Sequence, residues 1–202
     1  MQNRTKKMTG PMLNTERLIL RPYQKSDASD IVRQLKDRAV TRYTYMPYPY
    51  TAQDYFGFLR RISTPTARKA NLVFALIDRE SDKVIGAVGV HNLSVVNRSA
   101  EIGYWLAKKF WGKGYVVEAV NMVVAYLFTE RKLVRVYAKV FHPNTRSARV
   151  LEKAGFTSEG RLRKAAYHNK RWCDELLFGL LREDWSKRKP GGKSHRVRTK
   201  FQ

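Results

Sequence analysis

The sequence is poor in cysteine, in acidic residues and in long apolar stretches, and each shortage excludes a class of protein. The single cysteine, Cys173, cannot form a disulfide within the chain, so a disulfide-stapled secreted scaffold is excluded. A lone cysteine without clustered histidines also argues against a zinc site, and we expect no metal. No stretch is long and apolar enough to span a bilayer, and Met1–Met12 lacks the apolar core of a secretory signal. These absences predict a cytoplasmic protein with no membrane partner.

Acidic residues are outnumbered: 17 Asp and Glu face 40 Lys and Arg, which gives a net charge of +23. Such an excess implies an anionic partner, namely a phosphorylated cofactor, RNA or a ribonucleoprotein. The alternative is that the charge serves solubility alone. Charge by itself identifies neither the fold nor the reaction.

The composition predicts one folded domain between two basic tails. Hydrophobic residues make up 43% of the chain, which is enough for a core. The tails are expected at residues 1–12 and 186–202, and the second contains seven Lys or Arg and no acid. Basic tails of this kind contact nucleic acid or acidic surfaces. The folded domain is therefore expected at residues 13–185.

Apolar periodicity predicts strands alternating with helices. Strands are expected at residues 17–21, 72–77, 84–90, 101–106, 134–140, 160–166 and 171–181. Helices are expected behind the caps Ser26 and Asp27, from Thr51 to Ile62, over 115–130 and over 145–153. The segment from Tyr43 to Tyr50, rich in Tyr and Pro, is expected to be an irregular loop. Because only part of this order is βαβ, the sheet should be mixed, in an α/β fold.

A Gly-x-Gly turn lies between the strand at 101–106 and the helix at 115–130. Its residues are Lys109-Phe110-Trp111-Gly112-Lys113-Gly114, followed by Tyr115. Glycines let the backbone approach a ligand, and the unpaired N–H groups of a helix start favour an anion such as a pyrophosphate. The alternative is a tight connection without a ligand. The turn is not a Walker P-loop, because no Gly-Lys-Ser/Thr follows, and it lacks the third glycine of the Rossmann fingerprint.

A second polar pair opens the next helix. Asn144 and Ser147 are three residues apart, so both face the same side of the helix near its start. Taken alone, the pair is better explained as a plain N-cap beside a solvent-exposed serine.

Taken together, these motifs resemble the GNAT superfamily of N-acetyltransferases, in its ribosomal-protein-acetyltransferase (RimJ/RimL-like) branch. The resemblance spans residues 13–185. It is carried by Thr15–Pro22, by Glu101-Ile102-Gly103-Tyr104-Trp105-Leu106, by the glycine turn with Tyr115 and Glu118-Ala119, by Asn144–Phe156 and by Gly179–Trp185.

The resemblance implies a mixed, mostly antiparallel sheet of about seven strands with helices on both faces, splayed between the fourth and fifth strands. Acetyl-CoA would lie in that gap. Tyr104, Trp105 and Leu106 would bind its pantetheine arm through their backbone, and residues 110–115 would bind the pyrophosphate. Lys109 replaces the Arg or Gln common at the first turn position, which keeps the charge but loses the guanidinium fork. Asn144 and Ser147 would lie near the sulfur.

The resemblance also implies the catalytic residues. Glu101 would accept the amine proton, through water, unless it forms a salt bridge with a nearby Arg or Lys. The tyrosine acid of many relatives is replaced here by Leu151, so Ser147 is expected to donate the proton to the thiolate. Tyr43, Tyr45 and Tyr48 are expected at the acceptor site. His91, His142 and His168 are expected to be structural or solvated.

The resemblance and the positive charge leave three alternative functions. The first is acetylation of a protein N-terminal amine, with a ribosomal protein as the acceptor and the basic surface docked on rRNA. The second is acetylation of a small amine such as an aminoglycoside or polyamine, which needs a locally acidic groove. The third is a non-enzymatic RNA-binding module that retains the fold. The expected assembly is a monomer or a homodimer.

Overall fold

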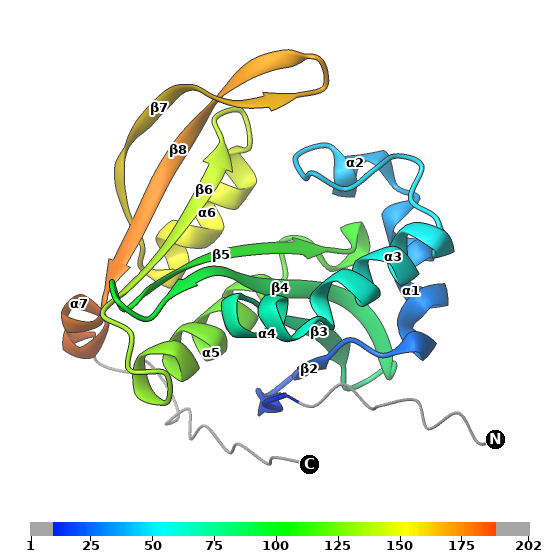
Figure 1. Cartoon of the computed structure of the whole chain (residues 1–202), viewed down its shortest axis with the longest axis horizontal. Coiled ribbons are helices and arrows are strands. Elements are labelled where there is room, and N and C mark those ends of the chain that lie inside the picture. Colours follow the sequence, from blue (N-terminus) through cyan, green and yellow to red (C-terminus); the bar gives the residue numbers. More distant parts are fainter. Residues whose placement is uncertain (1–9, 189–202) are drawn as a thin grey trace.

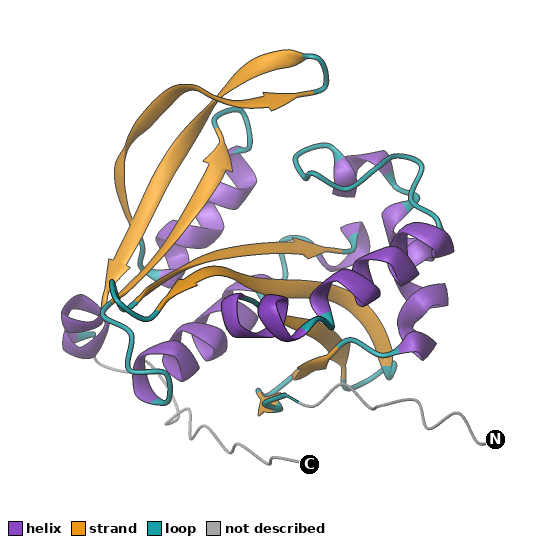
Figure 2. Ribbon diagram, in the orientation of Figure 1, coloured by secondary structure: helices purple, strands orange, loops and turns teal. Residues whose placement is uncertain are grey.

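A computed structural model describes residues 10–188, which form one sheet covered by helices on both faces (Figures 1 and 2). The elements in chain order are β1 (Leu13–Asn14), β2 (Leu18–Pro22), η1 (Lys25–Asp27), α1 (Ala28–Leu35), α2 (Arg38–Thr41), α3 (Ala52–Ile62), α4 (Pro65–Ala70), β3 (Leu72–Asp78), β4 (Lys83–Ser94), β5 (Ser99–Leu106), η2 (Lys108–Phe110), α5 (Tyr115–Thr129), β6 (Arg135–Phe141), α6 (Thr145–Ala154), β7 (Thr157–His168), β8 (Arg171–Leu181) and α7 (Arg182–Lys187).

The sheet has the order β1-β2-β3-β4-β5-β6-β8-β7, and its neighbouring strands are antiparallel except for β5 and β6. The parallel pair is short: only Ser99, Ala100 and Glu101 are in register with β6. Beyond Glu101 the two strands diverge, so the β6-facing edge of β5 has no strand partner. The mixed sheet and its splay, which were expected between the fourth and fifth strands, are confirmed, with the two-residue β1 as an added strand.

Two hydrophobic clusters lie on opposite faces of this sheet. The larger contains the apolar side of α5 together with Ala100 and Ile102 of β5. The smaller packs α1 and α3 against Ala87 and Trp105. Alternate residues of β5 thus point to opposite faces, because the side chains of a strand alternate. This alternation determines which β5 side chains reach the site.

The structure adds elements that the sequence pattern did not predict. Helices α2, α4 and α7 span only four to six residues, too short for an apolar period to appear. Strand β7 is 12 residues long, whereas the sequence pattern predicted seven. Nearly all of its side chains are exposed, so no alternation of buried and exposed residues marks its ends. Most of the tails expected at 1–12 and 186–202 lies outside the described residues. No helix among residues 10–188 is long and apolar enough to cross a membrane.

An ion pair fastens the start of the domain to the glycine turn. The Arg17 guanidinium lies 2.6 Å from the Glu118 carboxylate of α5 and donates to the carbonyl oxygen of Lys113 at 2.8 Å. It also lies over the Tyr115 ring, 4.2 Å from the centroid. Burial raises the pKa of Glu118, but hydrogen bonds from Thr15 and Arg17 outweigh burial, so the pKa is lowered overall. The contact holds β2, the turn and α5 together.

The Glu118 contact predicts a pH-dependent stability. A carboxyl group with a lowered pKa in the fold stabilises it above the pKa of the unfolded chain and ceases to do so as the pH falls through the folded pKa. We expect Glu118→Gln to reduce the free energy of unfolding by about 1–2 kcal/mol at neutral pH. The difference from wild type should shrink below pH 4.5, the ordinary pKa of this group.

Urea unfolding at several pH values measures this effect. Glu152→Gln is the matched control, since Glu152 is exposed on α6 and, within the described residues, forms no ion pair. A difference for Glu118→Gln that stays constant down to acidic pH would contradict the assignment.

Candidate active site

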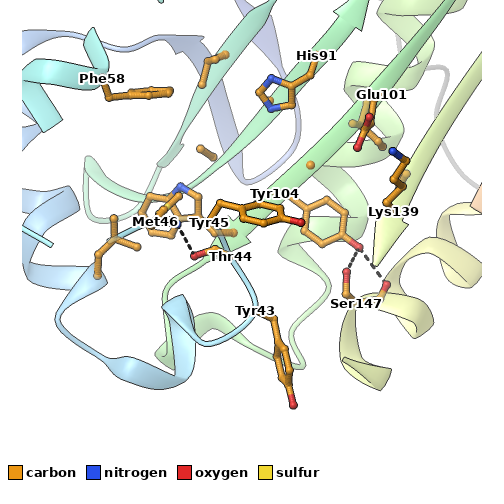
Figure 3. A pocket seen from close by; sticks show the side chains of 18 of the residues that line it. Tyr43, Thr44, Tyr45, Met46, Phe58, His91, Glu101, Tyr104, Lys139 and Ser147 are labelled. Atoms are coloured by element: carbon orange, nitrogen blue, oxygen red, sulfur yellow. Dashed lines mark hydrogen bonds between the residues drawn. The ribbon is translucent and has the colours of Figure 1, made fainter. Parts of the chain in front are cut away.

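A cavity of about 490 Å³ opens where β5 and β6 diverge (Figure 3). Its walls come from β4, β5, β6, β8, the start of α6, helices α1 and α3, and the loop after α2. The lining residues that matter below are Tyr43, Tyr45, His91, Glu101, Gly103, Tyr104, Lys139, Phe141, Asn144, Ser147 and Glu175. Segments far apart in the sequence therefore enclose one space.

Two facing glycines form part of the cavity floor. Gly89 of β4 is the register partner of Gly103 of β5. A Cβ added to Gly103 would meet nothing within 4 Å, whereas one added to Gly89 would lie 2.5 Å from Nε2 of His91. The His91 ring therefore lies over Gly89, and the space above Gly103 is open. Because neither glycine has a side chain, the face of the sheet beside Glu101 leaves space for the cavity.

Glu101 faces the same side of β5 as Gly103 and Trp105, as strand alternation predicts. Its Oε2 accepts a hydrogen bond from Nδ2 of Asn92 at 3.0 Å. Among residues 10–188, no Lys or Arg nitrogen lies within 4.0 Å of its carboxylate, so the alternative salt bridge does not form there. The carboxylate lines the cavity with a capacity to accept further hydrogen bonds.

His91 is the register partner of Glu101 and lines the same cavity. Its Nδ1 lies 3.3 Å from Oδ1 of Asn71. Burial lowers the pKa of His91, and the charge of Glu101 opposes this only in part, so the imidazole is neutral at pH 7. Sequence reasoning set His91 aside as structural. Only the β4–β5 register brings it beside Glu101, and no local pattern reveals that register.

Tyr104 points to the opposite face of β5 and reaches helix α6. Its hydroxyl donates to the backbone carbonyl oxygen of Ser147 at 3.0 Å and lies 2.9 Å from Ser147 Oγ (Figure 3). Because the phenol has one proton, the arrangement that satisfies both contacts has Oγ–H donating to the phenol oxygen. Burial raises the pKa of Tyr104 although the Ser147 hydrogen bond opposes this, so the phenol stays protonated. Sequence reasoning gave Tyr104 only a backbone role.

Helix α6 begins at the polar pair that the sequence singled out. Asn144 is the N-cap, and its Oδ1 accepts from the backbone N–H of Ser147 at 3.3 Å. Both residues line the cavity, as does Leu151, which is fully buried in the core one helical turn further on. Gly155, with φ of 91°, ends the helix. Asn144 thus has the capping role and lies in the cavity as well.

The glycine turn presents backbone donors beside positive charge. Gly112 and Gly114 adopt φ of 76° and 81°, the left-handed region that glycine tolerates. Within residues 10–188, no acceptor lies within hydrogen-bonding distance of the N–H groups of residues 112–117. Lys109 and Lys113 lie beside the Phe110 ring, at 4.8 and 6.0 Å from its centroid. This arrangement suits an anion at the start of α5.

The turn is joined to β5 through one side chain. The Trp111 indole N–H donates to the backbone carbonyl oxygen of Leu106 at 2.8 Å, and Arg146 of α6 lies over the Trp111 ring. The unpaired edge of β5, the turn and the start of α6 are therefore in contact around the opening. A pantetheine arm and a pyrophosphate would find backbone partners along this edge.

The three tyrosines expected at the acceptor site lie in different places. Tyr43 and Tyr45 line the cavity, and Tyr45 donates from its hydroxyl to Oε1 of Glu175 at 3.4 Å. Tyr48 is not among the lining residues, and its hydroxyl bonds to the carbonyl oxygen of Lys36. Within residues 10–188, no cluster of three His, Cys, Asp or Glu side chains is placed to hold a metal ion.

Comparison with known proteins matches residues 17–157 to the family described as the acetyltransferase (GNAT) domain. The uncharacterized N-acetyltransferase p20 of Bacillus licheniformis is 36% identical over 178 residues, which cover 86% of this chain and 98% of that protein.

Two solved structures share the fold. The ribosomal-protein-S5-alanine acetyltransferase of Vibrio fischeri superposes with a TM-score of 0.73 at 26% identity, covering 89% of this chain and 99% of that one. RimJ of Mycobacterium smegmatis, in complex with a CoA disulfide, superposes with a TM-score of 0.75 at 26% identity, covering 87% and 88%.

The cavity floor predicts opposite outcomes for two alanine substitutions. Gly103→Ala should leave the free energy of unfolding unchanged or raise it by up to about 1 kcal/mol, because the site is open and alanine restricts the unfolded chain. Gly89→Ala must displace the His91 ring and should lower the free energy of unfolding by about 1–3 kcal/mol. NMR titration should show a lowered His91 pKa in the first variant and a value nearer 6.5 in the second. Equal effects of the two substitutions would contradict this geometry.

Proposed function

This chain belongs to the GNAT family of N-acetyltransferases, and we propose that it acetylates the N-terminal α-amine of a protein, with a ribosomal protein as the acceptor. The observation that carries the proposal is the cavity at the β5–β6 splay, where Glu101 and Ser147 line one space. The acceptor class is supported by the V. fischeri neighbour, which is described as a ribosomal-protein-S5-alanine acetyltransferase and is 26% identical to this chain.

Acetyl-CoA is the acetyl donor in this family, and the residues around the opening fit it. The unpaired β5 edge at residues 104–106 would hold the pantetheine arm. The free N–H groups of residues 112–117, with Lys109 and Lys113, would hold the pyrophosphate. Gly112 and Gly114 keep side chains away from that approach. Bound acetyl-CoA would supply an acetyl group activated as a thioester.

In the proposed mechanism Glu101 takes the proton that the attacking amine loses. The amine must be neutral to attack a carbonyl carbon, and the new C–N bond leaves it with a proton to give up. The Glu101 carboxylate has room to accept that proton, directly or through water, above the hollow at Gly103. Neutral His91, its register partner, is a second group able to hold the proton.

Ser147 is proposed to supply a proton to the sulfur as the C–S bond breaks. Helix α6 has Leu151 where many relatives have a tyrosine, so the phenol of this site comes from the sheet, at Tyr104. When the Ser147 hydroxyl turns toward the sulfur, the Tyr104 O–H is placed to donate to Ser147 Oγ in its stead, at 2.9 Å. Tyr104 is therefore a positioning residue for Ser147.

Acetylation of a small cationic amine is the second candidate, and one observation favours it. In a chain of net charge +23, the cavity contains three carboxylates, from Asp54, Glu101 and Glu175, against Arg61 and Lys139. This is the locally acidic groove that such an acceptor needs.

Contact with rRNA through the basic surface remains part of the proposal. The catalytic domain, residues 13–185, would dock through its own cations and the basic ends. On the β7–β8 hairpin, Arg163, Lys164, Lys170 and Arg171 are exposed and, within residues 10–188, form no ion pair. Such binding should weaken steeply with salt.

Glu101→Gln should lower kcat/KM by roughly a hundredfold or more, the usual contribution of a general base. Glu152→Gln, on the exposed side of α6, is the matched control. Wild-type rates for Glu101→Gln would exclude this residue as the base.

Ser147→Ala should lower kcat at saturating acetyl-CoA, and Tyr104→Phe should lower it less. If Tyr104 acts through Ser147, the double variant should be no slower than Ser147→Ala alone. Steady-state kinetics with all four proteins tests this coupling. Wild-type turnover of Ser147→Ala would refute its role as the donor.

One assay tests the function as a whole. The purified protein is incubated with acetyl-CoA and, in turn, N-terminal peptides, ribosomal subunits, polyamines and aminoglycosides, and release of free thiol is followed. The proposal predicts acetylation of the peptides or of a ribosomal protein. Turnover of small amines alone would support the second candidate, and absence of CoA binding would overturn both.

A further inference from the structure

Glu175 of β8 is a buried carboxylate with one oxygen open to the cavity. Its side chain belongs to a residue only 7% exposed, and Oε1 accepts one long hydrogen bond, from Tyr45 at 3.4 Å. Among the described side chains of residues 10–188, which exclude that of Arg68, Oε2 has no hydrogen-bond donor and no Lys or Arg nitrogen lies within 4.0 Å of the carboxylate. No fully buried polar side-chain atom in that range lacks a partner, so Oε2 is accessible from the cavity that Glu175 lines.

A carboxylate taken out of water is costly unless a cation or several donors compensate it. The described part of the protein offers Glu175 one weak donor. The group is therefore complementary to a positively charged ligand that enters the cavity.

Tyr43, Tyr45 and Phe141 line the same cavity as Glu175, and His168, which is not among the lining residues, packs behind them. The centroids of Phe141 and His168 are 4.6 Å apart, Tyr45 lies 5.4 Å from Phe141, and Tyr43 lies 6.4 Å from Phe141. His168 also contacts the loop after α2, which contains Tyr43 and Tyr45: its Nε2 lies 3.0 Å from the carbonyl oxygen of Thr44. Aromatic faces beside a carboxylate are the chemistry that binds alkylammonium and guanidinium groups.

The register of β6 with its two neighbours gives the distance between Glu175 and Glu101 along the strand. Glu101 is the register partner of Tyr137, and Glu175 is the register partner of Phe141, four residues further along. At the rise of a strand this separation is roughly 13 Å along β6. Lys139 lies between them and lines the same cavity, so positive charge is favoured at the two ends. Glu101 and Glu175 are therefore far enough apart to contact different groups of one acceptor.

We propose that Glu175 and its surrounding rings bind a second cationic group of the acceptor, while the amine to be acetylated lies at Glu101. This inference rests on the proposed function. The ligand chemistry is an alkylammonium or guanidinium group roughly 13 Å from the reactive amine, a span that one or two residues and an extended Lys or Arg side chain cover. It has two sources, a Lys or Arg side chain near the N-terminus of a peptide and the distal ammonium of a polyamine.

Matched ligands test the proposal. Peptides with Lys at the second or third position are compared with the same peptides containing norleucine, and spermidine forms a separate arm. Turnover is followed by thiol release, and binding is followed by calorimetry in the presence of CoA. We expect wild type to favour the Lys peptides by on the order of ten- to a hundredfold in kcat/KM and in Kd.

Glu175→Gln should bring the Lys-to-norleucine ratio close to one. Glu183→Gln, exposed on α7 and outside the cavity, should keep the wild-type ratio. If Glu175→Gln does not fold, equal wild-type values for the two peptides still overturn the inference, because that comparison needs no variant.

Equal kcat/KM and equal Kd for the Lys and norleucine peptides, together with no binding of spermidine, would overturn the inference while leaving N-terminal acetylation intact. Binding and turnover of spermidine alone, lost in Glu175→Gln, would support the inference and overturn the peptide acceptor. A Lys preference that survives in Glu175→Gln would assign the cation to another group and overturn the role of Glu175.

Discussion

The parallel pairing of β5 with β6 ends after three residues, and the active site depends on where it ends. From Ile102 onward the edge of β5 offers backbone groups to a ligand instead of to a strand. Glu101 is the last paired residue, so its side chain lies at the point of divergence. The same divergence lets Tyr104 reach across to Ser147 on α6. A longer ladder between these strands would close the cavity and pair the backbone groups proposed to bind the donor.

The charges of the protein are arranged around this opening with opposite signs. Lys109 and Lys113 lie beside the Phe110 ring, in the same turn as the free N–H groups that would hold a phosphate. Glu101 and Glu175 line the cavity where an amine would enter. The excess of positive charge therefore does not extend into this cavity, whose lining has Asp54, Glu101 and Glu175 against Arg61 and Lys139. Arg17 and Glu118 hold the glycine turn in place and leave its outward N–H groups free.

Much of the fold could be predicted from the sequence, because the apolar period of α5 and the alternation along β5 are local properties. The splay followed from a resemblance, and not from any local pattern. The short helices α2 and α4 and the ends of β7 were not predicted, because short or exposed segments show no apolar period. For the site, alternation placed Glu101 and Gly103 together. His91 and Glu175 depend on strand register between segments far apart in the chain, which a single sequence does not encode locally.

Hydrogen–deuterium exchange with and without CoA measures the central claim directly, namely that the unpaired edge of β5 and the glycine turn bind the donor. Within residues 10–188, the unpaired amides of these two segments are those of residues 112–117 and, on β5, those that face away from β4, at Tyr104 and Leu106. They should become strongly protected when CoA binds. The β7–β8 hairpin, which lies away from the turn, serves as the internal reference (Figure 1). Protection at the β5 edge and the turn is the result predicted. CoA binding that leaves both segments as exchangeable as before would contradict the account.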